Sequence, residues 1–138
     1  MMLSGNFFYI KTLVQTTDKI EALIEINASH EIFFGHFPNQ PVVPGVCMMQ
    51  IIKEIFESAL AKKTNLINAD QLKFLAVLDP SKNIIVHAQI KYAIENNNQI
   101  KVAASLFNES IIYFKMNAVF VFQETQNKSN SLFIPNSE

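Results

Sequence analysis

The sequence lacks arginine and tryptophan and has a single cysteine among its 138 residues. Because all eleven basic residues are lysines, no guanidinium is available to clamp a phosphate or a carboxylate with paired hydrogen bonds. The lone Cys47 excludes an internal disulfide and is compatible with a reducing compartment. The formal net charge is −1 and the lysines form no basic block, which argues against nucleic acid as a main partner.

Long apolar runs are missing as well. No apolar stretch has the length of a membrane span, and residues 1–11 lack the basic and apolar parts of a signal peptide. Apolar residues make up 49% and charged residues 17%, a balance typical of a folded domain rather than a disordered chain. We therefore expect a soluble cytoplasmic protein with one domain over residues 1–123 and a polar, partly disordered C-terminal tail over residues 124–138.

Two periodicities divide the chain. A two-residue alternation of apolar and polar side chains predicts strands, and the stretch over residues 46–62, free of glycine and proline, predicts a long helix. Apolar residues cover most of that helix, so the remaining chain must enclose it. The class is therefore α+β, with an antiparallel sheet curled around the helix. The alternation predicts strands over residues 20–26, 84–92, 100–106 and 112–122. Two further strands are predicted over residues 7–14, which are rich in aromatic and branched side chains, and over residues 71–78, which end at Asp79-Pro80.

The segment from His30 to Gln50 is unusual in composition. It holds three of the five prolines, two of the three glycines and two of the three histidines. Glycine and proline shape the backbone, and Pro44-Gly45 directly before an apolar run predicts a helix start with free N–H groups at its mouth. A histidine on such a loop, His36, is a candidate for acid/base chemistry on a polarised carbonyl.

These residues carry a resemblance to a known family. Gly35-His36-Phe37-Pro38, followed in unbroken register by Pro41-Val42-Val43-Pro44-Gly45-Val46, resembles the signature of the 3-hydroxyacyl-acyl-carrier-protein dehydratases of fatty acid synthesis. Leu72-Lys73-Phe74 fits as well. The resemblance implies the hotdog fold, a curled antiparallel sheet wrapped around one long central helix. It also implies an enzyme without a cofactor that acts on 3-hydroxyacyl or enoyl thioesters in fatty acid or related acyl-chain synthesis.

The same resemblance implies a substrate carrier and an assembly. The acyl chain would arrive on the phosphopantetheine arm of acyl carrier protein, or as acyl-CoA. The family's sites lie at a dimer interface, with the histidine and the acid from different subunits, so we expect at least a homodimer.

The resemblance also assigns roles to individual residues. His36 would be the general base, and the backbone N–H groups of Gly45 and Val46 would stabilise the charge that develops on the thioester oxygen. The family's catalytic carboxylate lies fourteen positions after the histidine, which falls here on Gln50. Candidate substrate-binding residues around this site are Phe33, Phe34, Phe37, Pro44, Val46 and Met49.

An amide at position 50 leaves three alternatives open, because Gln50 can form hydrogen bonds but has no acidic proton to deliver. The protein is a slow dehydratase, in which water or His36 carries the second proton. It is a hotdog thioesterase, in which the amide orients a water. Or it is a non-catalytic module that binds acyl thioesters.

Glu54 is a candidate auxiliary acid. The dehydratase pattern that this segment resembles has Glu-x-x-x-Gln at this place, whereas this chain has Gln50 and Glu54, with the amide and the acid exchanged. The alternative is that Glu54 belongs to a polar stripe of the helix with Lys53 and Glu57. We expect His30 to structure its loop, Cys47 to fill the core, and no metal site, because no pair among the histidines and Cys47 has a ligand spacing.

Overall fold

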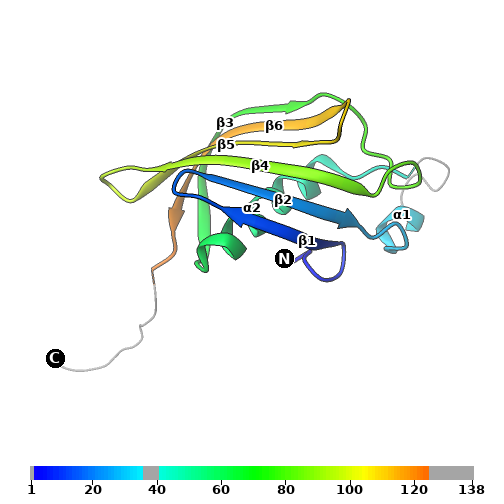
Figure 1. Ribbon diagram of the computed structural model, residues 1–138, viewed down its shortest axis with the longest axis horizontal. Helices are drawn as coiled ribbons and strands as arrows, with labels where there is room; N and C mark the ends of the chain where they lie inside the picture. The colour runs from blue at the N-terminus through cyan, green and yellow to red at the C-terminus, as the bar shows by residue number, and fades with distance from the viewer. Residues whose placement is uncertain (1, 36–40, 125–138) are drawn as a thin grey trace, which may run out of the picture.

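One antiparallel sheet of six strands forms the body of the protein. The computed structural model describes residues 2–35 and 41–124, and the strand order in the sheet is β1-β2-β4-β5-β6-β3. The sheet is open, with β1 and β3 at its edges, and it arches over one long helix (Figure 1). The strands are β1 (Phe8–Gln15), β2 (Lys19–Ile26), β3 (Thr64–Phe74), β4 (Ile85–Ile94), β5 (Gln99–Phe107) and β6 (Ile112–Phe122).

Helix α2 (Gly45–Leu60) fills the concave side of the sheet. It begins after Pro44, whose extended backbone precedes the first turn, and it ends at Ala61 in the left-handed conformation with φ 55°. Its apolar side chains pack against strands from β1 to β5, and the largest fully buried ones are Ile51, Ile52, Ile55 and Phe56. The predicted α+β class, with a sheet wrapped around a central helix, is confirmed.

Strand β3 departs from the prediction of a strand over residues 71–78. It begins at Thr64 and ends at Phe74, so the predicted start was seven residues late and the predicted end four residues late. β3 pairs with β6 and has two register irregularities, one between Leu66 and Asn68 and one between Ala69 and Gln71. Because each irregularity interrupts the alternation of side chains, the two-residue period does not appear in the sequence of this strand.

A second departure is the short helix α1 (Ile32–Gly35), which the sequence analysis did not predict. One turn is too short to display a helical period. The buried Phe33 fixes this turn against the ring of Phe7, with 5.4 Å between the ring centroids. In the described part of the chain, no helix combines the length and the apolarity that crossing a membrane requires.

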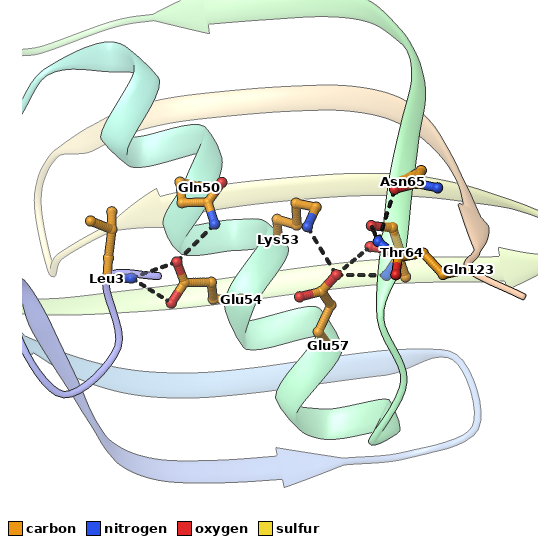
Figure 2. A network of polar contacts seen from close by, with 8 residues as sticks. All are labelled: Leu3, Gln50, Lys53, Glu54, Glu57, Thr64, Asn65 and Gln123. Atoms are coloured by element: carbon orange, nitrogen blue, oxygen red, sulfur yellow. Dashed lines mark hydrogen bonds and ion pairs between the residues drawn. The ribbon is translucent and has the colours of Figure 1, made fainter. Parts of the chain in front are cut away.

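The polar stripe of α2 is bonded to other elements rather than simply solvated. Glu57 is buried, and its Oε2 accepts hydrogen bonds from the backbone N–H of Thr64 at 2.6 Å and from the Thr64 hydroxyl at 3.0 Å. Lys53 forms an ion pair with the same oxygen at 3.0 Å. These contacts tie the last turns of α2 to the first residue of β3 (Figure 2).

We expect the Glu57→Gln variant to be less stable at neutral pH by about 1.5–3 kcal/mol, the scale of hydrogen bonds to a charged group. Burial raises the pKa of Glu57, but the hydrogen bonds from Thr64 and Lys53 outweigh it, and the net pKa is lowered. A lowered pKa in the folded state stabilises above the unfolded value of about 4.3 and loses that effect as the pH falls through the folded value.

The measurement for this prediction is urea unfolding of both proteins at pH 7 and at pH 3 to 4. The difference in unfolding free energy should shrink at the lower pH. An equal difference at both pH values would contradict the assigned role of the charge.

Candidate active site

The N-terminus of α2 is the centre of the candidate site. The preceding segment is held in place because the backbone N–H of Val43 donates to the carbonyl of Leu78 at 2.9 Å. Within α2, the N–H groups of Cys47 and Met48 donate to the carbonyl of Pro44 at 3.0 and 3.1 Å. The amides of Gly45 and Val46 come before these, so helix geometry gives them no acceptor inside the helix. They lie at the positive end of the helix dipole, where a developing oxyanion is stabilised.

Gly45 is in close contact with β3. A Cβ atom built on Gly45 would lie 2.7 Å from Cε1 of Phe74 and 2.9 Å from its Cζ, closer than real Cβ contacts allow. The Phe74 ring also stacks on the buried Phe114, with 5.0 Å between the centroids, yet Phe74 remains 53% exposed. The absence of a side chain at position 45 therefore has a packing reason in addition to the thioester approach that the resemblance implies.

Gln50 and Glu54 meet one turn apart on α2. Nε2 of Gln50 donates a hydrogen bond to Oε2 of Glu54 at 2.8 Å (Figure 2). The two side chains are therefore in direct contact, as residues at i and i+4 of a helix can be, and the pair needs no bridging water.

Glu54 also anchors the N-terminal segment. Its carboxylate accepts the backbone N–H of Leu3 at 2.7 and 3.0 Å and that of Ser4 at 2.7 Å. The side chain is buried, with 6% of the residue exposed. These bonds join residues fifty positions apart, so no sequence period could reveal them. The role of Glu54 as auxiliary acid stays a prediction, and the structure adds an anchoring role that the sequence analysis missed.

The predicted substrate-binding residues divide by exposure. Phe33 is buried in the core, whereas Phe34 is 66% and Val46 64% exposed. Pro44 and Met49 are half-buried. Val46 is in the first turn of α2 and Phe34 is in α1, and both are exposed apolar side chains; the substrate-binding role of these residues stays a prediction. The predicted residues His36 and Phe37 lie outside the described part of the chain.

Two other predicted roles are confirmed. Nδ1 of His30 accepts the backbone N–H of Ile32 at 3.1 Å, and its ring packs edge-on against Phe7, so His30 structures the loop around α1. Cys47 is buried in the core, and burial raises the pKa of its thiol. Among residues 2–35 and 41–124, no three His, Cys, Asp or Glu side chains gather as a set of metal ligands.

Comparison with solved structures identifies the fold. The chain superposes on one chain of the dehydratase heterocomplex ApeI:P from Xenorhabdus doucetiae with a TM-score of 0.65 and 18% identity, covering 81% of this chain and 96% of that one. A sigma28-regulated virulence protein from Campylobacter jejuni gives a TM-score of 0.61 at 10% identity, covering 82% of this chain and 83% of that one. At these identities the likeness concerns the fold alone, and the fold is the hotdog fold.

Sequence comparison identifies the family. The family model ApeI-like, described as ApeI dehydratase, matches residues 12–116, and the chain therefore belongs to the ApeI-like dehydratase family. The 3-hydroxyacyl-[acyl-carrier-protein] dehydratase FabZ of Actinobacillus succinogenes is 31% identical over 68 residues, covering 49% of this chain and 45% of the relative. FabZ of Lactococcus lactis subsp. cremoris is 30% identical over 79 residues, covering 52% and 55%. The matches thus span about half the length of these curated relatives.

Proposed function

We propose that this protein acts on 3-hydroxyacyl or enoyl thioesters as a hydro-lyase of the dehydratase type. The observation that carries the proposal is the start of α2, where the amides of Gly45 and Val46 lie at the helix N-terminus directly after the signature segment. His36 would remove the proton next to the thioester carbonyl. The helix amides would stabilise the enolate oxygen that forms.

Gln50 shapes the second half of the reaction. In the elimination, the C–H bond breaks first and its electron pair enters the enolate; the C–O bond then breaks and the hydroxyl leaves as water after gaining a proton. Gln50 has no acidic proton to give, so His36 would return the proton that it took, or a bound water would supply one. The reaction therefore balances without a cofactor, but its second step lacks a positioned acid.

The test is a turnover assay with a short 3-hydroxyacyl thioester of acyl carrier protein. Enoyl thioester and free thiol are followed together. Formation of the enoyl product supports the proposal. Release of free thiol, with no enoyl product, would show the alternative, a hotdog thioesterase. Saturable binding without either product would show an acyl-thioester binding module.

We place the protein in the cytoplasm, where acyl carrier protein or acyl-CoA would deliver the substrate.

The apolar face of β3 supports a homodimer. Leu66, Leu72 and Phe74 pair across the sheet with the buried residues Phe120, Met116 and Phe114. Opposite residues of antiparallel strands point to the same side, so these three side chains face the concave, helix-covered side of the sheet. They are nevertheless 41%, 37% and 53% exposed, because β3 is the edge strand. We propose that a second copy of the chain covers this face around a two-fold axis.

We expect the Leu72→Glu variant to be a monomer under conditions in which the native protein is a dimer. Dimer formation would bury the new carboxylate in the apolar interface without an opposite charge beside it, which is costly. Val14→Glu is the matched control, since Val14 is 60% exposed on β1, the opposite edge of the sheet. Light scattering coupled to size-exclusion chromatography gives the mass of each. A monomeric native protein would contradict the homodimer. If the native protein is a monomer that dimerises only with another hotdog subunit that bears the carboxylate, the partner on this face would be that subunit and not a second copy of this chain.

A further inference from the structure

The orientation of the Gln50 amide is set by Glu54. A carboxylate can only accept in this contact, whereas an amide has an NH2 group that donates and a carbonyl oxygen that accepts. The hydrogen bond from Nε2 of Gln50 to Oε2 of Glu54 therefore requires the nitrogen to face Glu54. Figure 2 shows the amide nitrogen turned toward Glu54 and the oxygen turned away from it.

Glu54 is itself held in place from a distant part of the chain. Both of its carboxylate oxygens accept backbone N–H groups of the N-terminal segment, from Leu3 and Ser4. The residue is 6% exposed, so the carboxylate has little freedom to turn. Every one of these bonds uses Glu54 as an acceptor, and the orientation imposed on Gln50 follows from them.

We infer that Glu54 is a positioning residue that makes Gln50 present a hydrogen-bond acceptor to the substrate. The inference rests on the proposed function, which puts position 50 beside carbon 3 of the acyl thioester. The Gln50 oxygen has two lone pairs, so it can accept from a substrate group whatever other contact it makes. A 3-hydroxyl group can donate to that oxygen. A 3-oxo group cannot donate, because its oxygen is an acceptor like the Gln50 oxygen that it would face.

The consequence is a substrate preference. The protein selects thioesters that carry a hydrogen-bond donor at carbon 3 over thioesters with a 3-oxo group at the same position. One hydrogen bond gained against one unsatisfied acceptor corresponds to a preference on the order of tenfold. A glutamic acid at position 50, by contrast, could donate its proton or accept, and would not make this distinction by orientation.

Binding of two amide analogues tests the inference on the full chain. The probes are the 3-hydroxybutyryl and 3-oxobutyryl amides of aminopantetheine, which resist turnover because an amide acidifies the neighbouring carbon less than a thioester does. We expect the native protein to bind the hydroxy analogue on the order of tenfold more tightly, as measured by calorimetry.

Three variants separate positioning from general stability, because the readout is a ratio of two affinities. In Glu54→Gln, the new side chain can keep its oxygen on Leu3 and Ser4 and turn its NH2 group to Gln50, whose amide then reverses; the preference should be lost or inverted. Gln50→Met has similar length but neither donor nor acceptor, and should abolish the preference. Ser58→Ala, at an exposed position one turn beyond Glu54, should keep it.

The possible failures are distinguishable. If the native protein binds neither analogue, the proposed function is overturned, and this inference with it. If it binds both equally, or prefers the 3-oxo analogue, only the inference about Gln50 is overturned. If Glu54→Gln folds and keeps the native ratio while Gln50→Met loses it, the assignment of Glu54 as the positioning residue is overturned. If Glu54→Gln does not fold, an unchanged ratio in Gln50→Met would still overturn the inference.

Discussion

The Gln50→Glu variant is expected to form enoyl thioester about 10²–10⁴ times faster than the native protein, the usual contribution of a positioned general acid. The new carboxylate would replace an amide whose nitrogen is 2.8 Å from Oε2 of Glu54. Two carboxyl groups at this distance cannot both ionise easily, so the pair is expected to share a proton and one pKa is raised. A shared proton near neutral pH is what the departing hydroxyl needs.

The same reasoning predicts the pH dependence of this variant. Repulsion between the two carboxylates should make Gln50→Glu less stable than the native protein at pH 7. A pKa raised in the folded state means that this loss of stability is present at high pH and fades as the pH falls and the pair takes up a proton. The double variant Gln50→Glu, Glu54→Gln has the acid–amide order that the resemblance to the dehydratases implies. It should avoid the loss of stability, and its gain in rate should be smaller than that of Gln50→Glu alone, because the second carboxyl group that raises the pKa is gone.

A matched control is available on the same helix. Ser58→Glu adds the same acid one turn beyond Glu54, at an exposed position away from Gln50. It should leave the rate of enoyl formation unchanged. If Ser58→Glu accelerates the reaction as much as Gln50→Glu, or if Gln50→Glu does not accelerate it at all, position 50 is not the site of the missing acid.

The second large effect is expected for His36→Ala, which should lower enoyl formation by about 10²–10⁴-fold through loss of the general base. His36 follows α1 directly in the chain and precedes the Pro41–Pro44 segment that leads to α2. Removing the imidazole also removes the group that would return the proton to the leaving hydroxyl. With Gln50 unable to compensate, we expect little residual turnover.

The control for this prediction is His87→Ala. His87 is exposed on β4 and stacks on Phe107, with 5.4 Å between the centroids, so it is a histidine of this chain outside the candidate site. Both variants are assayed with the same 3-hydroxyacyl thioester, and their unfolding midpoints are compared. Equal turnover of His36→Ala and native protein would remove His36 from the mechanism, and the family resemblance would then describe the fold only.

Much of the fold was predictable because its local patterns are strong. Helix α2 was predicted from an apolar run without glycine or proline, and its observed bounds, Gly45–Leu60, begin at the predicted Pro44-Gly45 start. Strands β2, β4, β5 and β6 were predicted from alternation because each has one buried and one exposed face, and β1 was predicted from its aromatic and branched residues. When one side of an element is buried, apolar residues recur at the period of that element, and this period distinguishes a strand from a helix.

Strand β3 and helix α1 were mispredicted for the opposite reason. β3 is an edge strand with irregular register, so its first residues, Thr64 to Asp70, show no clear alternation. α1 is a single turn that packs through Phe33. In both cases the element is stabilised by contacts with residues far away in the chain, and the local sequence pattern does not indicate those contacts.

By itself, the sequence determined the class of the protein, the place of the signature loop before α2 and the amide at position 50. Local periodicity and fixed spacing carry that information. Only the tertiary structure decided that Glu54 is tied to Leu3 and Ser4 and turns the Gln50 amide, and that Phe74 lies against Gly45. Glu54 and its partners Leu3 and Ser4, like Gly45 and Phe74, are far apart in the chain and meet only in the folded protein, and the Gln50 amide, one helical turn from Glu54, is oriented by a carboxylate that this distant segment holds in place.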